Sequence, residues 1–276
     1  MRFRGGESSI TEASAIFVGM STSIEFLGTG TSQGVPVVAC PCGVCRSNDP
    51  RDRRLRSSVL IRHGGSNVVI DAGPDLRQQL LRSEVRALDG VLLTHEHMDH
   101  IAGIDELRAL NFAQQRAMDV YGSTRTLDAV RRTFHYAFAE ERYPGVPELV
   151  LKPVGAEPFM VADLRFQPIE VMHQTMPVLG FRLGRFAYIT DAKTIPSAER
   201  EKLRGLDLLV LNALRHKSHP SHLNVQEALA LVEDLAPKRT LFTHISHLLG
   251  LHAESRAFLP VGVELAYDGQ VVELGL

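Results

Sequence analysis

The sequence contains no tryptophan, only three cysteines and few aromatic residues, 6% of the chain. An odd number of cysteines cannot form a complete disulfide framework. Neither sign of charge predominates, because 30 Lys and Arg residues nearly balance 32 Asp and Glu residues and leave a net charge of −2. This balance provides no basic field for nonspecific nucleic-acid binding. No run approaches the roughly 18 to 20 apolar residues of a membrane-spanning helix. These absences argue against a disulfide scaffold, a general nucleic-acid coat and a membrane-spanning protein.

The 276 residues, 44% of them hydrophobic, are enough for one large domain. Residues 1–19 lack the apolar core and cleavage site of a secretory signal. We expect them to be a disordered extension or the result of a misplaced start site, and we expect residues 20–276 to form a single domain. The chain is therefore predicted to be cytoplasmic.

Short apolar and β-branched runs predict buried strands at residues 23–28, 58–63, 67–71, 90–94, 118–122, 179–183, 186–190, 207–212 and 239–243. Two segments have helical periodicity: Leu127, Val130, Phe134 and Phe138 in one, and Val225, Ala228, Leu229, Val232 and Leu235 in the other. Asn224 and Glu227 predict the N-cap of the second helix. Because strands outnumber helices without a strict βαβ rhythm, we expect face-to-face sheets with helices outside.

A cluster of three histidines and an aspartate directly follows the predicted strand 90–94. The segment T-H-E-H-M-D-H contains His95, His97, Asp99 and His100. These residues cannot all face one way from a regular helix or strand, so we predict a tight loop that directs them to a shared point. Imidazole and carboxylate groups are ligands for Zn²⁺, Mn²⁺ or Fe rather than for Ca²⁺. The segment therefore predicts a metal site.

All three cysteines lie in a second short motif, C-P-C-G-V-C, at Cys40, Cys42 and Cys45. In a cytosolic protein this spacing favours metal binding over a disulfide. Three thiolates leave a tetrahedral Zn²⁺ one ligand short, and Cys₃His is a known structural site. A histidine from elsewhere in the chain would complete it.

The motif H-x-H-x-D-H after a buried strand resembles that of the metallo-β-lactamase superfamily. Further motifs follow in that family's order, with His173, Asp191 and His244 at expected strand ends and Asp71 at the early strand end. The resemblance covers residues 23–274 and implies an α/β (α+β) fold, an αββα sandwich with two divalent metals (Zn, Mn or Fe). It assigns the ligands as follows: His95, His97 and His173 for one metal, Asp99, His100 and His244 for the other, and Asp191 as the bridge. Asp71 is expected to support the loop without binding metal.

The cysteine cluster together with T-H-I-S-H resembles a narrower branch, the cyclic phosphate phosphodiesterases of the carbon-phosphorus lyase pathway. That resemblance implies a structural zinc held by the three cysteines and His247. The segment L-G-T-G-T-S-Q-G-V-P at 27–36 is also similar. Its glycines indicate a tight turn with close backbone approach, which we prefer over a phosphate-binding loop.

Three histidines lie in the segment R-H-K-S-H-P-S-H, just before the second predicted helix. The resemblance aligns His222 with a proposed general acid, and a histidine near metals could protonate a leaving oxygen. His219 is the alternative for this role. We expect the other histidines outside the motifs to be structural or surface residues: His63, His135, His216 and His252.

The resemblance implies a phosphodiesterase acting on a small substrate, cyclic or acyclic, such as phosphoribosyl 1,2-cyclic phosphate. The metals would hold a shared hydroxide, with Asp99, Asp191 and His222 as catalytic residues. The alternatives are a tRNA 3′-processing nuclease, a thioesterase and a non-catalytic metal-binding module. The chain shows no long basic arm for tRNA, so a nucleic-acid partner is not favoured, and a homodimer is left open.

Residues 111–160 look longer than the corresponding part of the cyclic phosphate phosphodiesterases. Within this segment, Tyr136, Arg142 and Tyr143 could form a lid over the substrate. A helix and loop that simply pack on the sandwich are the alternative.

Overall fold

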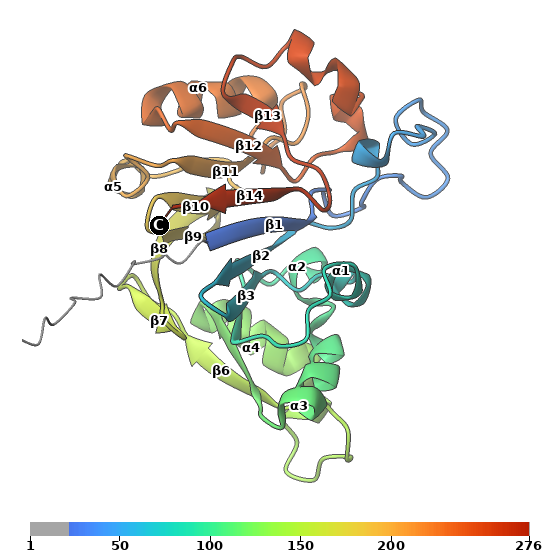
Figure 1. Ribbon diagram of the computed structural model, residues 1–276, viewed down its shortest axis with the longest axis vertical. Coiled ribbons are helices and arrows are strands. Elements are labelled where there is room, and N and C mark those ends of the chain that lie inside the picture. The colour runs from blue at the N-terminus through green and yellow to red at the C-terminus, as the bar shows by residue number, and fades with distance from the viewer. Residues whose placement is uncertain (1–21, 276) are drawn as a thin grey trace, which may run out of the picture.

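The computed structural model describes residues 22–275, so the expectation for residues 1–19 lies outside its scope. The chain forms two seven-stranded mixed sheets (Figure 1). The first contains, in spatial order, β14 (Val271–Leu274), β1 (Thr22–Gly28), β2 (Ser58–His63), β3 (Ser66–Ile70), β4 (Gly90–Leu92), β5 (Met118–Gly122) and β6 (Leu149–Pro153). The second contains β13 (Val263–Leu265), β12 (Arg239–Thr243), β11 (Leu208–Asn212), β10 (Phe186–Ile189), β9 (Met176–Leu183), β8 (Leu164–His173) and β7 (Phe159–Val161).

The two sheets enclose a central core, and helices cover their outer faces. Side chains such as Phe26, Phe181 and Tyr188 fill the space between the sheets and are fully buried. One outer face is covered by α1 (Leu76–Arg82), α2 (Met98–Ile101), α3 (Arg108–Gln114) and α4 (Thr124–Thr133), and the other by α5 (Ser197–Glu201) and α6 (Val225–Leu235) (Figure 1). This is the αββα sandwich that the sequence predicts.

The predicted strands all form, whereas five further strands were not predicted. Three have the predicted bounds, five differ by one or two residues at an end, and β9 begins three residues earlier than predicted. The strands missed are β6, β7, β8, β13 and β14.

Both predicted helices form, but one is shorter than its apolar pattern suggested. Helix α4 ends at Thr133, and Phe134 and Phe138 pack against the same core from the following turn. Helix α6 begins as predicted, because the Asn224 side chain accepts a hydrogen bond from the Glu227 amide at 2.8 Å and the Glu227 side chain accepts one from the Asn224 amide at 2.9 Å. Helices α1, α2, α3 and α5 were not predicted.

Parallel strand pairing determines where the polar residues meet. Strands β3 and β4 run parallel in one sheet, and β10, β11 and β12 run parallel in the other. The carboxyl ends of parallel strands lie at the same edge of a sheet, where sites are commonly built. Asp71, Asp191 and His244 each follow such a strand. No helix among residues 22–275 combines the length and the apolar character needed to cross a membrane.

Candidate metal centre

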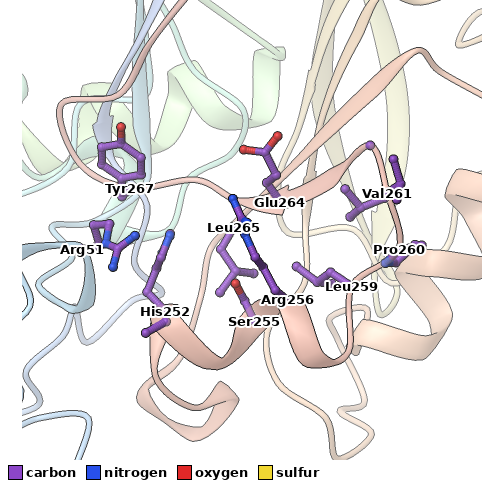
Figure 2. A pocket seen from close by; sticks show the side chains of 13 residues that line it. Arg51, His252, Ser255, Arg256, Leu259, Pro260, Val261, Glu264, Leu265 and Tyr267 are labelled. Carbon is purple, nitrogen blue, oxygen red and sulfur yellow. The ribbon is translucent and has the colours of Figure 1, made fainter.

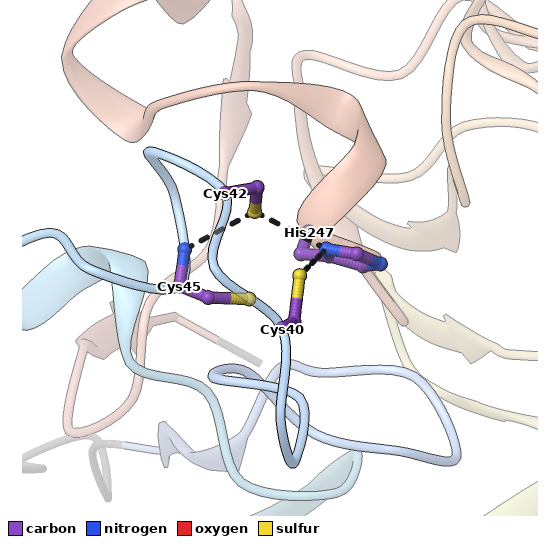
Figure 3. A group of neighbouring side chains, drawn as sticks. All are labelled: Cys40, Cys42, Cys45 and His247. Atoms are coloured by element: carbon purple, nitrogen blue, oxygen red, sulfur yellow. Dashed lines mark hydrogen bonds between the residues drawn. The ribbon is translucent and has the colours of Figure 1, made fainter.

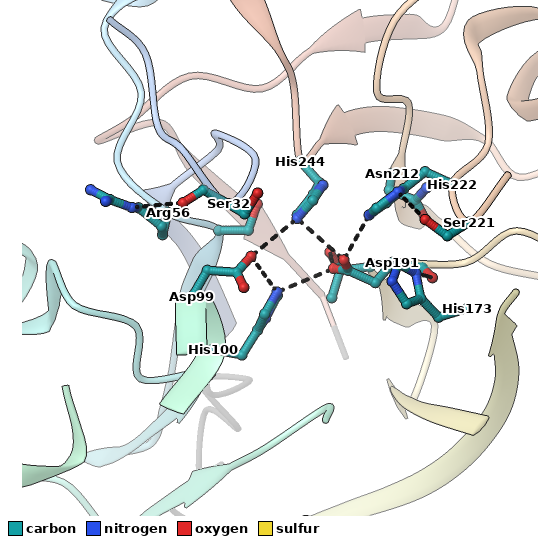
Figure 4. Close-up of polar contacts among 12 residues, drawn as sticks. Ser32, Arg56, Asp99, His100, His173, Asp191, Asn212, Ser221, His222 and His244 are labelled. Carbon is teal, nitrogen blue, oxygen red and sulfur yellow. Dashed lines mark hydrogen bonds and ion pairs between the residues drawn. The ribbon is translucent and has the colours of Figure 1, made fainter. Parts of the chain in front are cut away.

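Asp191 and His244, which follow two of these strands, lie beside Asp99 and His100 (Figure 4). His100 Nε2 lies 3.1 Å from Asp99 Oδ2 and 3.3 Å from Asp191 Oδ2. His244 Nε2 lies 3.3 Å from Asp191 Oδ1 and 3.5 Å from Asp99 Oδ2. The structure therefore brings together candidate ligands from three separate parts of the chain.

Three sets of side chains place their ligand atoms within 4.8 Å of one another: His95 with His100 and Asp191, Asp99 with His100 and His244, and His173 with Asp191 and His222. Asp191 belongs to two of these sets, an arrangement compatible with a bridging carboxylate. His97 belongs to none of them. Its ring packs against His95 and His173, with centroids 4.6 and 5.2 Å apart, so it lies beside the cluster.

The chemistry of this donor set fits divalent metals. Among the described residues, His95 Nε2, His100 Nε2 and His244 Nε2 are buried without a hydrogen-bond partner. Buried polar atoms are normally paired, so unpaired imidazole nitrogens beside carboxylates fit the binding of a cation.

The ionisation states of His95 and Asp191 also suit metal binding. Burial lowers the pKa of His95 well below its usual value, which keeps the imidazole neutral. Burial opposes ionisation of Asp191, but the imidazoles of His244 and His100 outweigh it and hold the pKa of that carboxyl well below its usual range. Neutral imidazole and ionised carboxylate are the forms that bind metal.

Backbone conformation at the strand ends helps to place these ligands. Asp71, Asp191 and His244 have φ angles of 66°, 55° and 55°, in the left-handed region that residues other than glycine seldom adopt. Such conformations cluster at functional sites. Each lets the chain turn directly after a buried strand, so that the side chain faces the cluster.

Asp71 contacts the histidine-rich segment, as a supporting residue would. It is fully buried, and its Oδ2 lies 2.7 Å from His100 Nδ1. Its Oδ1 accepts a hydrogen bond from the Thr94 amide at 2.9 Å. Burial raises the pKa of this carboxyl, although His100 acts in the opposite direction. These contacts orient His100 so that its Nε2 faces Asp99 and Asp191.

His222 lies in the cluster itself rather than at its edge. Its Nε2 is 2.9 Å from Asp191 Oδ1, and its ring packs against those of His173 and His244. Burial lowers the pKa of His222 to about 4. The position suits proton transfer, and it also makes His222 a possible ligand, which the sequence did not indicate.

The other candidate acid, His219, contacts His222 directly. Their Nδ1 atoms are 3.1 Å apart, and Ser221 Oγ lies 3.2 Å from His219 Nδ1 and 3.0 Å from His222 Nδ1. The two histidines therefore form one hydrogen-bonded unit, in which only His222 reaches Asp191.

Two supporting residues were missed by the sequence analysis. Thr190 Oγ1 donates to Asp191 Oδ2 at 2.7 Å. The Asn212 side chain forms two hydrogen bonds with the backbone of Ala192, accepting from its amide at 2.8 Å and donating to its carbonyl at 2.9 Å. The sequence signal for Asn212 is an asparagine at the end of an apolar strand, and the structure shows that this side chain is fully buried.

The glycine-rich segment 27–36 has the structural role preferred from sequence. A Cβ on Gly28 would lie 2.0 Å from the Arg56 carbonyl oxygen, and one on Gly30 would lie 2.8 Å from the Arg54 carbonyl oxygen. The glycines therefore allow close backbone packing. This packing brings Ser32, whose carbonyl accepts a hydrogen bond from Arg56 Nε at 3.1 Å, to the side of the centre where Asp99 lies (Figure 4).

The three cysteines and His247 form a separate cluster (Figure 3). His247 Nδ1 lies 3.4 Å from the Sγ atoms of both Cys40 and Cys42. The hydrogen bond with His247 lowers the pKa of Cys42 to about 6, which favours the thiolate. The donor set matches a Cys₃His metal site.

The other histidines and the lid residues named from the sequence lie outside both clusters. His63 contacts Thr22, whereas His135 and His216 are exposed. Tyr136 donates a hydrogen bond to Asp105 at 2.6 Å, and Arg142 to the Ala137 carbonyl at 3.5 Å. Tyr143 is largely exposed. These contacts show local packing, and the lid stays a prediction.

Comparisons with known proteins agree with this architecture. The family model described as "Beta-lactamase superfamily domain" matches residues 66–245. A crystal structure titled as a new diphosphatase from the PhnP family is 40% identical, with a TM-score of 0.87, and the match covers 92% of this chain and 98% of the other. The chain therefore belongs to the metallo-β-lactamase superfamily and, within it, to the PhnP family.

Two further relatives have other names. A protein of Porphyromonas gingivalis named octanoyltransferase is 43% identical over 246 residues, which are 88% of this chain but 50% of that protein. The chain thus spans about half the length of this curated relative. The short form of human tRNase Z is 21% identical with a TM-score of 0.65, covering 91% of this chain and 98% of the other, a likeness of fold alone.

Proposed function

We propose that the chain is a metal-dependent hydrolase that cleaves a phosphorus–oxygen bond in a small phosphodiester or diphosphate ester. The main support is the convergence of unpaired buried imidazole nitrogens with Asp99 and Asp191. The 40% identical relative titled as a diphosphatase supports a phosphorus-containing substrate. A cyclic diester such as phosphoribosyl 1,2-cyclic phosphate is the substrate that we favour.

The active-site cluster would hold two divalent cations, Zn, Mn or Fe, and the cysteine cluster would hold a structural zinc. In the proposed assignment, His95, His97 and His173 bind one cation, Asp99, His100 and His244 bind the other, and Asp191 binds both. Such cations lower the pKa of water and neutralise charge on phosphoryl oxygens.

The chain's own residues would orient the ligands and move the proton. Asp71 and Thr190 fix His100 and Asp191 through the hydrogen bonds described above. Hydrolysis forms a bond from the water oxygen to phosphorus and breaks the bond to the leaving oxygen, which needs a proton. His222 would supply it from Nε2. A bound phosphate anion favours the protonated imidazole, which burial alone disfavours.

A substrate panel with the metal-loaded protein tests this proposal. It compares ribose 1,2-cyclic phosphate, a 2′,3′-cyclic nucleotide, a diphosphate ester, a precursor tRNA and an octanoyl thioester. We expect turnover of the cyclic or diphosphate esters and little of the last two. Cleavage of only the tRNA or the thioester would contradict the proposal, and so would metal binding without turnover of any substrate.

Two variants test the assigned roles. Asp191→Ala should lose active-site metal and activity together, and retained turnover of bis(p-nitrophenyl) phosphate would contradict bridging by Asp191.

His222→Ala should keep the metals and slow the hydrolysis of esters with poor leaving groups more than that of esters with good ones. An equal loss of activity toward both classes of ester would contradict the role of His222 as the general acid. His216→Ala, in the same loop but exposed, is the matched control.

A further inference from the structure

A cavity of about 500 Å³ lies between the turn η5 (His252–Ala257), strand β13 and the turn η1 (Pro50–Asp52) (Figure 2). None of the candidate metal ligands lines it. Its volume falls within the range of about 300 to 1,000 Å³ that is typical of small-molecule sites. The cavity is therefore a candidate binding site separate from the metal centre.

Two guanidinium groups line this cavity. Arg256 is exposed and has no hydrogen-bond or ion-pair partner among residues 22–275, so its donors are available to a ligand. Arg51 pairs with Asp49, with Nη2 and Oδ2 2.7 Å apart, which fixes its side chain. The carboxylate in the lining, Glu264, is paired with Arg239 at 3.1 Å. The unpaired charge in the cavity is therefore positive.

His252 adds a directed neutral donor. Arg54 Nη2 lies 3.3 Å from His252 Nδ1. An arginine can only donate, so Nδ1 must accept and the ring proton must be on Nε2. The His252 amide donates to Asp52 Oδ1 at 2.7 Å, which fixes the backbone at this position. In Figure 2, the side chains of Arg51 and His252 point toward the same part of the cavity, and Arg256 rises from η5 toward β13.

The lining also includes apolar side chains. Leu259, Val261 and Leu265 contribute to it, and Val261 is fully exposed. The Tyr267 ring packs against His252, with centroids 5.8 Å apart. A bare inorganic anion would use the cationic groups but leave this apolar surface uncovered. A ligand with both an anionic group and an organic body would use both parts.

We propose that this cavity binds a small phosphorylated metabolite, with its phosphate held by Arg51, His252 and Arg256 and its organic body against Leu259 and Val261. Guanidinium groups suit phosphate because their donors match its oxygen geometry. The proposal is independent of the reaction at the metal centre.

Isothermal titration calorimetry of the metal-loaded full-length chain tests the proposal, with ribose 5-phosphate and inorganic phosphate as probes. The metal centre can also bind phosphate, so the comparison is between variants. We expect Arg256→Glu to remove one ribose 5-phosphate site or weaken it by about tenfold or more, because a charge-assisted contact becomes a repulsion. Arg256→Gln should weaken the same site less.

The matched control is Arg131→Glu, an exposed arginine on α4 outside the cavity. It should bind ribose 5-phosphate like the wild type. Metal content and melting temperature establish that each variant is folded. Identical stoichiometry and affinity in the wild type, Arg256→Glu and Arg256→Gln would overturn the proposal. Equal affinity of this site for inorganic phosphate and ribose 5-phosphate would overturn the contribution of the organic body.

Discussion

Asp71 is fully buried beside the candidate metal centre, where it forms hydrogen bonds with His100 and Thr94. Asp71→Asn replaces a charged acceptor by an amide and weakens the orientation of His100. Loss of such a supporting contact typically lowers metal affinity by about 10 to 100-fold. Competition with a chromophoric chelator measures the change. Asp119→Asn, on strand β5 outside the centre, is the control, and equal affinity of the two variants would refute the supporting role of Asp71.

His252 should make the free energy of unfolding depend on pH. Burial lowers its pKa to about 4, with the charges of Arg54 and Arg51 acting in the same direction and those of Asp49 and Asp52 opposing them. In the unfolded chain the imidazole takes up a proton near its ordinary value of 6.5. The unfolded state therefore binds more protons between these pH values, and stability falls as pH decreases through that window.

His252→Gln removes this titration while keeping an oxygen that can accept a hydrogen bond from Arg54. Urea unfolding at pH 7 and pH 5 should show that the wild type loses about 1 to 2 kcal/mol more than the variant over this interval, after allowance for partial exposure. Other titrating groups are common to both proteins and cancel in the difference. The same pH slope in both proteins would show that His252 does not contribute.

Helix α6 depends on its capping box for the start that the sequence predicts. Asn224→Ala removes the side-chain acceptor for the Glu227 amide, and we expect a loss of about 1 kcal/mol in the free energy of unfolding. Chemical denaturation measures this loss. Gln226→Ala, an exposed change in the first turn of the same helix, should have little effect. Because alanine has the higher helix propensity, a loss in Gln226→Ala equal to that of Asn224→Ala would contradict the capping role of Asn224.

The strands also show how much of the fold can be predicted from the sequence. Strands such as β5 and β12 were found because they are short apolar runs with clear ends. Strand β8 was missed because its exposed positions are polar and Pro168 interrupts the pattern, although it pairs with β9 along its length. The ligand order was recognisable, but the contact of His222 with Asp191 was not. The contact between His222 and Asp191 depends on a loop that is held by the hydrogen bond from the Leu223 amide to the Ala192 carbonyl.

At the scale of the whole molecule, the two sheets supply different parts of the metal centre. The first sheet leads into the segment with His95, Asp99 and His100, in which His95 precedes helix α2 and Asp99 and His100 belong to it, rather than all three lying in the predicted tight loop. The second sheet presents His173, Asp191 and His244 at its strand ends. Neither sheet alone completes the donor set. The packing of Phe26, Phe181 and their neighbours between the sheets therefore holds the two half-sites together.

The cysteine cluster connects the N-terminal part of the chain to the segment after β12. Cys42 and His247 are separated by 205 residues in sequence, so a metal held between them closes a long loop. Cys42→Ser should reduce metal content from about three ions per chain to about two, since the serine leaves a Cys₃His site one thiolate short. Cross-links that close long loops stabilise by about 2 to 4 kcal/mol, and we expect a loss of that order. Val38→Ser, an exposed change in the same loop, is the control. Elemental analysis and denaturation measure both effects, and unchanged metal content in Cys42→Ser would contradict the assignment of Cys42 as a metal ligand.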